Sequence, residues 1–252
     1  MAKLKVPSLQ HLARNWHGDS KYVCKVLVRL AENPPKFGYG ALFSAVVDRL
    51  VLHVPYEQVA EGIRRREKRE AVRENLLSVL PLIEEHFDGI EPSFVQTIKP
   101  RYYPLARGIM IPFEPPLLYG LGGRIHFPWF SFWRSNPIAA QRLSLFVTLI
   151  DDLLLQDPDL EDAKFEILDF SSPGKGLPRE LSVVDAKDIQ RVAEKTKIEM
   201  LSVFAEGFLM AQEKLANSPQ EAEEAEDRPD KDENQSSSVK NSSDRASSRV
   251  RH

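Results

Sequence analysis

The sequence predicts a mixed α/β fold, in which a helical N-terminal region precedes a mixed sheet flanked by helices, and a disordered C-terminal tail follows. Three observations lead to this prediction. Apolar residues recur at helical spacing up to residue 89, and β-branched and aromatic residues gather between prolines from residue 90 onward. After residue 216 there is no Leu, Ile, Phe, Tyr or Trp. We therefore expect a helical region (1–89), an α/β body (90–216) and a charged, Ser-rich tail (217–252).

Helix-breaking residues divide the first region into short helices. The breaks fall at Gly18, at residues 33–35 (Asn-Pro-Pro), at Pro55 and near Arg69. One helix should begin after Ser20 as its N-cap, and another should span about residues 39–53. The last should be one continuous helix that ends near Gly89 and carries Val72, Leu76, Leu80 and Ile83 on its buried face.

The body should alternate strands and helices. We expect strands over residues 107–113, 117–119 and 124–133, with a glycine turn at residues 120–123. A helix should follow from about Pro137, and residues 164–170 and 180–185 should form a hairpin. A final helix over about residues 192–216 should close the domain. Its packing face should carry Ile198, Leu201, Phe204, Phe208 and Leu215.

Charge is distributed unevenly between body and tail. The formal net charge is −3, and residues 217–252 contain nine acidic and six basic side chains, which leaves 28 of each sign in residues 1–216. A tail of this composition cannot bury enough apolar area to offset the entropy of ordering it. The body is formally neutral, so it lacks the strongly basic field that favours nucleic-acid binding in general.

The expected compartment is the cytoplasm. No apolar stretch approaches the roughly 20 residues that a membrane helix needs, and the N-terminus has no apolar segment typical of a secretory signal. The single cysteine, Cys24, excludes a disulfide within the chain and fits a reducing compartment. We therefore expect no membrane association, while the oligomeric state is left open.

Familiar catalytic signatures are absent from the sequence. It contains no nucleophile elbow, no phosphate-binding loop, no zinc helix and no paired cysteines, and its six histidines show no metal-binding spacing. We predict no metal site and no resident cofactor. The weak catalytic candidates are Glu114, His126 and Asp169, because they fall near the ends of expected strands.

A basic run between two expected helices is the first candidate binding site. Arg64, Arg65, Lys68 and Arg69 lie close together, and on one helix Arg65, Lys68 and Arg69 would share a face able to contact phosphates. Glutamates are interleaved at ion-pairing distances, which favours an ordinary solvated helix instead. Both interpretations stay open at this point.

An aromatic segment is the second candidate. On a strand, Phe127, Trp129 and Ser131 point to one face while Phe130 and Phe132 point to the other. This pattern favours a central strand covered on both sides. Base stacking, or partner binding through Trp129 and Trp133, is the alternative.

One resemblance to a known family concerns residues 70–216. The expected order is helix, two or three strands, helix, strand, strand, helix, which resembles the core of the PD-(D/E)XK nuclease superfamily, especially its RecB-type branch. Three segments resemble that branch's motifs: residues 123–126 (Gly-Arg-Ile-His), 130–135 (Phe-Ser-Phe-Trp-Arg-Ser) and 141–146 (Gln-Arg-Leu-Ser-Leu-Phe). The resemblance implies a nuclease-like fold whose metal ligands and water-orienting lysine would lie on two successive strands.

The departures from the family pattern concern the catalytic positions. His126 stands where a metal-binding aspartate belongs, Ser131 replaces the second carboxylate and Trp133 replaces the lysine. Metal-assisted phosphodiester hydrolysis needs each of those residue types, so Mg²⁺ would be required only if the site were active. We expect a non-catalytic, nuclease-like interaction protein associated with nucleic acid or a nucleic-acid-processing complex. The alternatives are a metal-dependent hydrolase with an unrecognised site and a pure protein-binding module.

Overall fold

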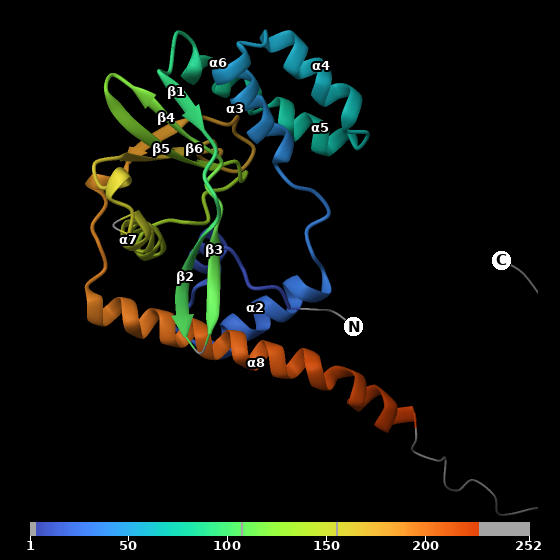
Figure 1. Cartoon of the computed structure of the whole chain (residues 1–252). Coiled ribbons are helices and arrows are strands. Elements are labelled where there is room, and N and C mark those ends of the chain that lie inside the picture. The colour runs from blue at the N-terminus through green and yellow to red at the C-terminus, as the bar shows by residue number, and fades with distance from the viewer. Residues whose placement is uncertain (1–3, 107, 155, 227–252) are drawn as a thin grey trace, which may run out of the picture. The chain divides into compact units, whose positions relative to one another are not determined.

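A computed structural model describes residues 4–106, 108–154 and 156–226. The chain divides into one compact unit over Met1–Ala216 and a second unit over Asn217–His252. The expected mixed α/β architecture is confirmed within the first unit, which contains a mixed sheet covered by helices (Figure 1). Most of the predicted tail lies outside the described residues.

Six short helices precede the sheet, and all except α5 end near a break that the sequence marks. Their bounds are α1 Leu9–Asn15, α2 Ser20–Glu32, α3 Gly40–Leu52, α4 Tyr56–Arg66, α5 Glu70–Leu77 and α6 Leu80–Phe87. Glycine at position 89 has a φ of 68°, which suits a turn after the last helix because glycine adopts this left-handed conformation without strain.

Two details of these helices differ from the expectation. The N-cap of α2 is Asp19, whose carboxylate accepts a hydrogen bond from the backbone N–H of Lys21 at 2.9 Å, and Ser20 is already helical. The predicted single helix through Val72 and Ile83 is wrong, because the chain breaks between α5 and α6 at Ser78 and Val79. Pro81 then occupies the first turn of α6, where its missing N–H costs nothing.

The main sheet contains five strands in the order β1-β4-β5-β6-β7. Their bounds are β1 Phe94–Gln96, β4 Leu118–Leu121, β5 Arg124–Ser131, β6 Lys164–Asp169 and β7 Ser182–Asp185. Only β5 and β6 run parallel, with His126 opposite Lys164 and Ser131 opposite Asp169. The predicted hairpin of β6 and β7 is confirmed as an antiparallel pair.

A second sheet consists of β2 (Arg101–Ala106) and β3 (Ile109–Phe113), which form an antiparallel hairpin apart from the main sheet. The sequence predicted β3 two residues too long and missed β1 and β2. Between β4 and β5 the chain turns at Gly122 and Gly123, whose φ values of 59° and 77° are typical of a tight two-residue hairpin turn.

Helices close both faces of the main sheet. Helix α7 (Gln141–Leu154) connects the parallel strands β5 and β6, and it begins four residues after the predicted start at Pro137. Helix α8 (Glu194–Glu226) continues ten residues beyond the predicted end at Ala216. None of the helices among the described residues combines the length and the apolar character that a bilayer crossing requires.

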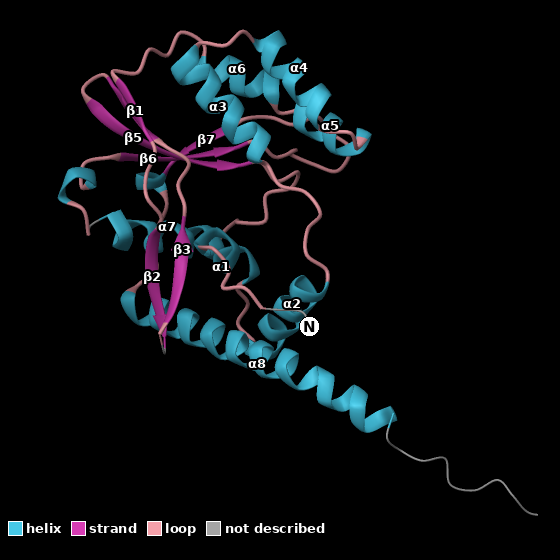
Figure 2. Cartoon of the chain, turned by 45° about the vertical axis from the view of Figure 1, so that its right-hand side comes forward, coloured by secondary structure: helices cyan, strands magenta, loops and turns pink. Residues whose placement is uncertain are grey.

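Two hydrophobic clusters lie on opposite faces of the sheet. One combines Phe127 and Trp129 of β5 with α1, α2, α7, α8 and the β2–β3 hairpin, and the other combines Phe130 with α3, α4, α5 and α6. Figures 1 and 2 show these helices on either side of the strands. The predicted alternation along β5 is therefore confirmed, since consecutive side chains enter different clusters.

Candidate functional site

The candidate site is a cleft at the carboxyl end of β5. Strand β4 pairs with β5 only over residues 119–121 and 124–126, so the second half of β5 is paired with β6 on one side alone among the described strands. The chain before β4 turns away toward β3 and leaves a cleft of about 730 Å³. Ligands of open α/β sheets bind outside the carboxyl ends of parallel strands, where this cleft lies. We call it the β5 cleft.

Four separate segments line the β5 cleft. They are α1, the linker between α2 and α3 with the first turn of α3, the linker between β3 and β4, and the end of β5 with the loop after it. The lining residues are Gln10, His11, Arg14, Pro35, Phe37, Gly38, Tyr39, Phe43, Glu114, Pro116, Trp129, Phe130, Phe132, Trp133, Arg134, Ser135 and Pro137. This volume is in the range of ligand-binding cavities, and the lining combines apolar walls with a few polar groups.

Aromatic rings form much of the wall. The rings of Trp129 and Trp133 lie 5.8 Å apart, and those of Phe43 and Phe132 lie 5.1 Å apart. Both pairs meet edge to face, an arrangement that aromatic rings prefer. Phe37 differs from the others because it is 41% exposed, and its ring contacts only Tyr39, at 5.6 Å, among the described aromatic residues. Phe37 thus leaves an open aromatic face at the cleft.

Arginines supply the charge of the cleft. The guanidinium of Arg14 lies over the ring of Trp133, 5.1 Å from the ring centroid. This stacking fixes the plane of the guanidinium and leaves the N–H donors of Arg14 free. Arg134 is exposed and lines the same cleft. Neither arginine forms an ion pair within the part of the chain that the structure describes, and Glu114 is the only lining carboxylate. The cleft therefore carries an excess of unpaired positive charge.

His11 lies between these groups. Its Nδ1 is 2.7 Å from the hydroxyl of Ser8, and its ring contacts the edge of Trp133 at 5.7 Å between centroids. Burial lowers the pKa of His11 below its ordinary value of 6.5, and the nearby charge of Arg14 lowers it further. The lowered pKa favours the neutral form of His11 at neutral pH.

A buried arginine supports the loop that forms the floor of the cleft. Arg179, only 8% exposed, donates to the carbonyls of Phe132, Trp133 and Phe170 at 3.2, 3.1 and 2.7 Å. It also donates to Oδ1 of Asn75 in α5 at 2.7 Å. Burial lowers the pKa of Arg179. No sequence signal indicated this role, because Arg179 lies in the loop of the predicted hairpin.

The three catalytic candidates do not converge. Glu114 lines the β5 cleft, whereas His126 bonds through Nδ1 to the carboxylate of Glu166 at 2.8 Å and stacks on Tyr119 near the start of β5. Asp169 ends β6, where it accepts a hydrogen bond from the hydroxyl of Ser171 at 3.0 Å. Its other oxygen and the hydroxyl of Ser131 are buried without a hydrogen-bond partner among the described residues. The described residues contain no group of three metal-binding side chains.

The motif correspondence also changes. His126 and Ser131 both lie on β5, five residues apart, which separates them by about 16 Å along the strand. The resemblance implies these two positions on successive strands, whereas β5 carries both of them. Gln141, the first residue of the third segment, is the first residue of α7.

The basic run has a different structure from the one predicted. Helix α4 ends at Arg66, so Lys68 and Arg69 lie beyond it and do not share a helical face with Arg65. Arg65 and Arg69 contact Glu61 and Glu67 at 2.8 and 2.9 Å, and Arg64 lies 3.9 Å from Glu61. The interleaved glutamates therefore pair with three of the four candidates, while Lys68 has no ion pair among the described residues.

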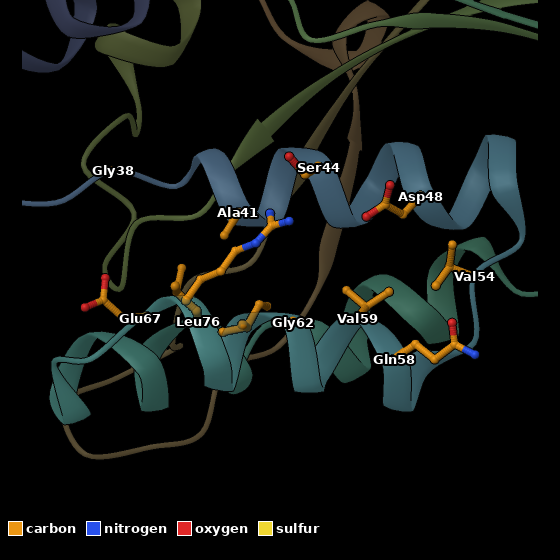
Figure 3. A pocket seen from close by; sticks show the side chains of 12 residues that line it. Gly38, Ala41, Ser44, Asp48, Val54, Gln58, Val59, Gly62, Glu67 and Leu76 are labelled. Atoms are coloured by element: carbon orange, nitrogen blue, oxygen red, sulfur yellow. The ribbon is translucent and has the colours of Figure 1, made fainter.

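A smaller cavity of about 350 Å³ lies between α3 and α4 (Figure 3). Small side chains of α3, Ala41 and Ser44, face Gly62 and Val59 of α4 across it. Asp48 and Gln58 lie toward one end and Glu67 toward the other. Asp48, Arg66 and Glu67 are the charged residues of its described lining.

Neither the models of known protein families nor the sequences of curated proteins match this chain. The candidate site therefore depends on geometry alone. Of the two predicted partner-binding residues, Trp129 is buried and Trp133 is partly buried, and both line the β5 cleft.

Proposed function

We propose that this protein binds single-stranded nucleic acid in the β5 cleft without cleaving it. The observation that carries the proposal is the pair of unpaired arginines, Arg14 and Arg134, in a cleft walled by aromatic rings. Arginine recognises phosphate, and aromatic side chains stack on bases of any sequence. The protein would then act as a non-catalytic component of a nucleic-acid-processing complex.

The size of the cleft favours a single strand. A cavity of about 730 Å³ holds one or two nucleotides but not a double helix. Bases in a duplex are stacked on both faces, so they are accessible to Phe37 only after unstacking, which costs a few kcal/mol. An unpaired base presents its face directly.

The order of elements supports a nuclease-like body. Apart from the β2–β3 hairpin, the chain from residue 70 passes through helices, three strands, α7, two strands and α8, which is the order that the resemblance implies. The segment aligned with the nuclease's second motif, residues 130–135, lines the β5 cleft with five of its six residues. In this proposal the nuclease's catalytic position has become a binding site.

The chemistry of the lining argues against hydrolysis. Among the described lining residues Glu114 is the sole carboxylate and there is no lysine, whereas metal-assisted hydrolysis requires a coordinated cation and an activated water. We therefore expect no turnover with Mg²⁺ or Mn²⁺. A cytoplasmic location, which the single buried cysteine favours, stays a prediction.

The test is a fluorescence-polarisation titration of the full chain with labelled 12-nucleotide single strands and the matched duplexes, at 50 and 200 mM salt. We expect single strands to bind at least about tenfold more tightly than duplexes, with affinity that falls as salt rises. The same mixtures with Mg²⁺ should show intact strands on a denaturing gel. Absence of binding to every strand, or cleavage, would contradict the proposal.

A further inference from the structure

A second groove lies between the β2–β3 hairpin and α8, far in sequence from the β5 cleft. It has a volume of about 740 Å³ and is lined by residues 103–106 of β2 and by one face of α8. Along α8 the lining residues recur at intervals of three and four, so they form one continuous helical face. We call it the α8 groove.

The α8 groove has an apolar floor and an exposed apolar rim. Leu201 and Ala205 are buried at its base, and Leu209 is half-buried further along the helix. Ile198 was predicted on the packing face of α8, but it is 58% exposed and lines the groove. An exposed isoleucine beside buried leucines marks a surface suited to a further apolar contact.

The charge of the groove is negative. Glu206 and Glu213 are exposed, and neither forms an ion pair among the described residues. The one lysine in the described lining, Lys197, is buried and its ammonium lies 2.7 Å from the carboxylates of both Asp152 and Glu194. It is therefore not available to neutralise the two free glutamates. A second copy of the chain facing the first through this groove would bring like charges together.

The hairpin edge does not accept another strand. Strand β2 pairs only with β3 among the described strands, so its outer edge borders the groove. Pro104 lies in the middle of β2 and has no N–H to donate. Proline at such a position disfavours pairing of an exposed strand edge with another strand. A helix, whose backbone groups are already paired, is the occupant that suits an apolar groove with charged rims.

We propose that the α8 groove binds a basic amphipathic helix of a partner protein. Glu206 and Glu213 are seven residues apart, which places them on one face of α8 about 10.5 Å from each other. The partner helix therefore carries lysine or arginine at two positions two turns apart, with a leucine-like side chain between them against Leu209. A further apolar side chain, about two turns beyond the position that faces Glu206, would contact Ile198. This inference is independent of nucleic-acid binding, because it involves no residue of the β5 cleft.

The test uses the full chain with Ser202→Cys, an exposed groove residue, labelled with an environment-sensitive fluorophore. Native Cys24 is buried and should label poorly. The probe is an 18-residue synthetic helix with leucines at spacings of three and four and lysines seven residues apart. Its control replaces both lysines with glutamates. We expect saturable binding of the lysine helix and at least about tenfold weaker binding of the glutamate helix.

Matched variants locate the binding site. Glu206→Lys/Glu213→Lys should weaken binding about tenfold, and the milder Glu206→Gln/Glu213→Gln about fivefold. The charge-matched control Glu161→Lys/Glu199→Lys lies outside the groove and should change affinity less than about twofold. Thermal melts check that every variant folds. Equal weakening by both double reversals, or no binding of the lysine helix, would overturn the proposal.

Discussion

Arginines of the α4 region and arginines of the β5 cleft have different surroundings. Arg64, Arg65 and Arg69 lie within 4.0 Å of glutamate carboxylates that are two to four residues away in the same segment. Arg14 and Arg134 are 120 residues apart in sequence, and the fold brings them to one cleft with no carboxylate partner among the described residues. A dense run of arginines in sequence can be internally neutralised, whereas scattered arginines can form the unpaired charge that binds an anion.

The largest difference between the two regions should appear in how much the loss of one arginine lowers the free energy of unfolding. Arg179→Met would remove the donor shared by three carbonyls beneath the cleft, leaving them buried and unpaired, so we expect a loss of about 2–4 kcal/mol in the free energy of unfolding. Arg65→Met removes a pair whose arginine is 78% exposed and should cost less than about 0.5 kcal/mol.

Chemical denaturation with urea measures both values on the full chain. Arg179→Lys is a useful intermediate, since it keeps the charge but reaches fewer acceptors. A cost for Arg179→Met similar to that for Arg65→Met would mean that the cleft loop holds its position without the buried guanidinium.

The next effect concerns the open aromatic face. Phe37→Ala should weaken single-strand binding about tenfold, because stacking on one aromatic ring contributes about 1–3 kcal/mol per base. Tyr22→Ala, an exposed aromatic residue on α2 outside the cleft, should leave affinity unchanged. Fluorescence polarisation with the same 12-nucleotide strand measures both. Unchanged affinity of Phe37→Ala would place base stacking elsewhere in the cleft.

A smaller effect should appear in the pH dependence of binding. The pKa of His11 is lowered in the free protein, and a bound phosphate raises it, so the protonated form binds more tightly. Affinity should therefore rise about threefold as pH falls from 7.5 to 5.5, with Arg14, Arg134 and Glu114 as the other charged groups lining the cleft. His11→Asn should remove this rise. If affinity still rose at low pH in His11→Asn, the group whose protonation strengthens binding would be one other than His11.

Substitutions in the α4 region should have the smallest effect on single-strand binding, because its arginines are already paired with glutamates. A carboxyl titration can detect this pairing directly. Hydrogen bonds from Arg69 lower the pKa of Glu67 from 4.5 to about 2. Its contribution to stability is thus present above pH 4.5 and is lost as pH falls toward about 2. Carboxyl NMR titration should find this low midpoint in the native chain and a higher one in Arg69→Ala, still below 4.5 because the backbone N–H of residue 69 continues to donate to Glu67. An ordinary midpoint in the native chain would mean that Arg69 is free for a ligand.

Local signals in the sequence accounted for much of the fold. Gly18, Pro55 and residues 33–35 end helices through backbone restrictions that need no tertiary contact. The alternation along β5 was likewise readable, because the strand period is two. The break between α5 and α6 was missed, since the apolar spacing continues across Ser78 and Val79. The strands β1 and β2 were missed because short, proline-flanked strands are defined by their partners.

The β5 cleft was only partly predictable. Trp129 and Trp133 were singled out as a dense aromatic segment, but Arg14, Arg134 and Phe37 carry no local signal. They form a binding surface only because the fold brings four segments together at the end of β5. The exposure of Ile198 was missed for a similar reason, because helical periodicity predicts a face without saying what covers it.

The most direct test of the account compares two double variants in single-strand binding, Arg14→Gln/Arg134→Gln and Arg65→Gln/Arg69→Gln, which change the net charge equally. We predict that the first weakens binding at least about thirtyfold and reduces its salt dependence, while the second changes affinity less than about twofold. Equal effects, or a larger effect of the α4 variant, would contradict the claim that unpaired arginines in the β5 cleft bind the strand.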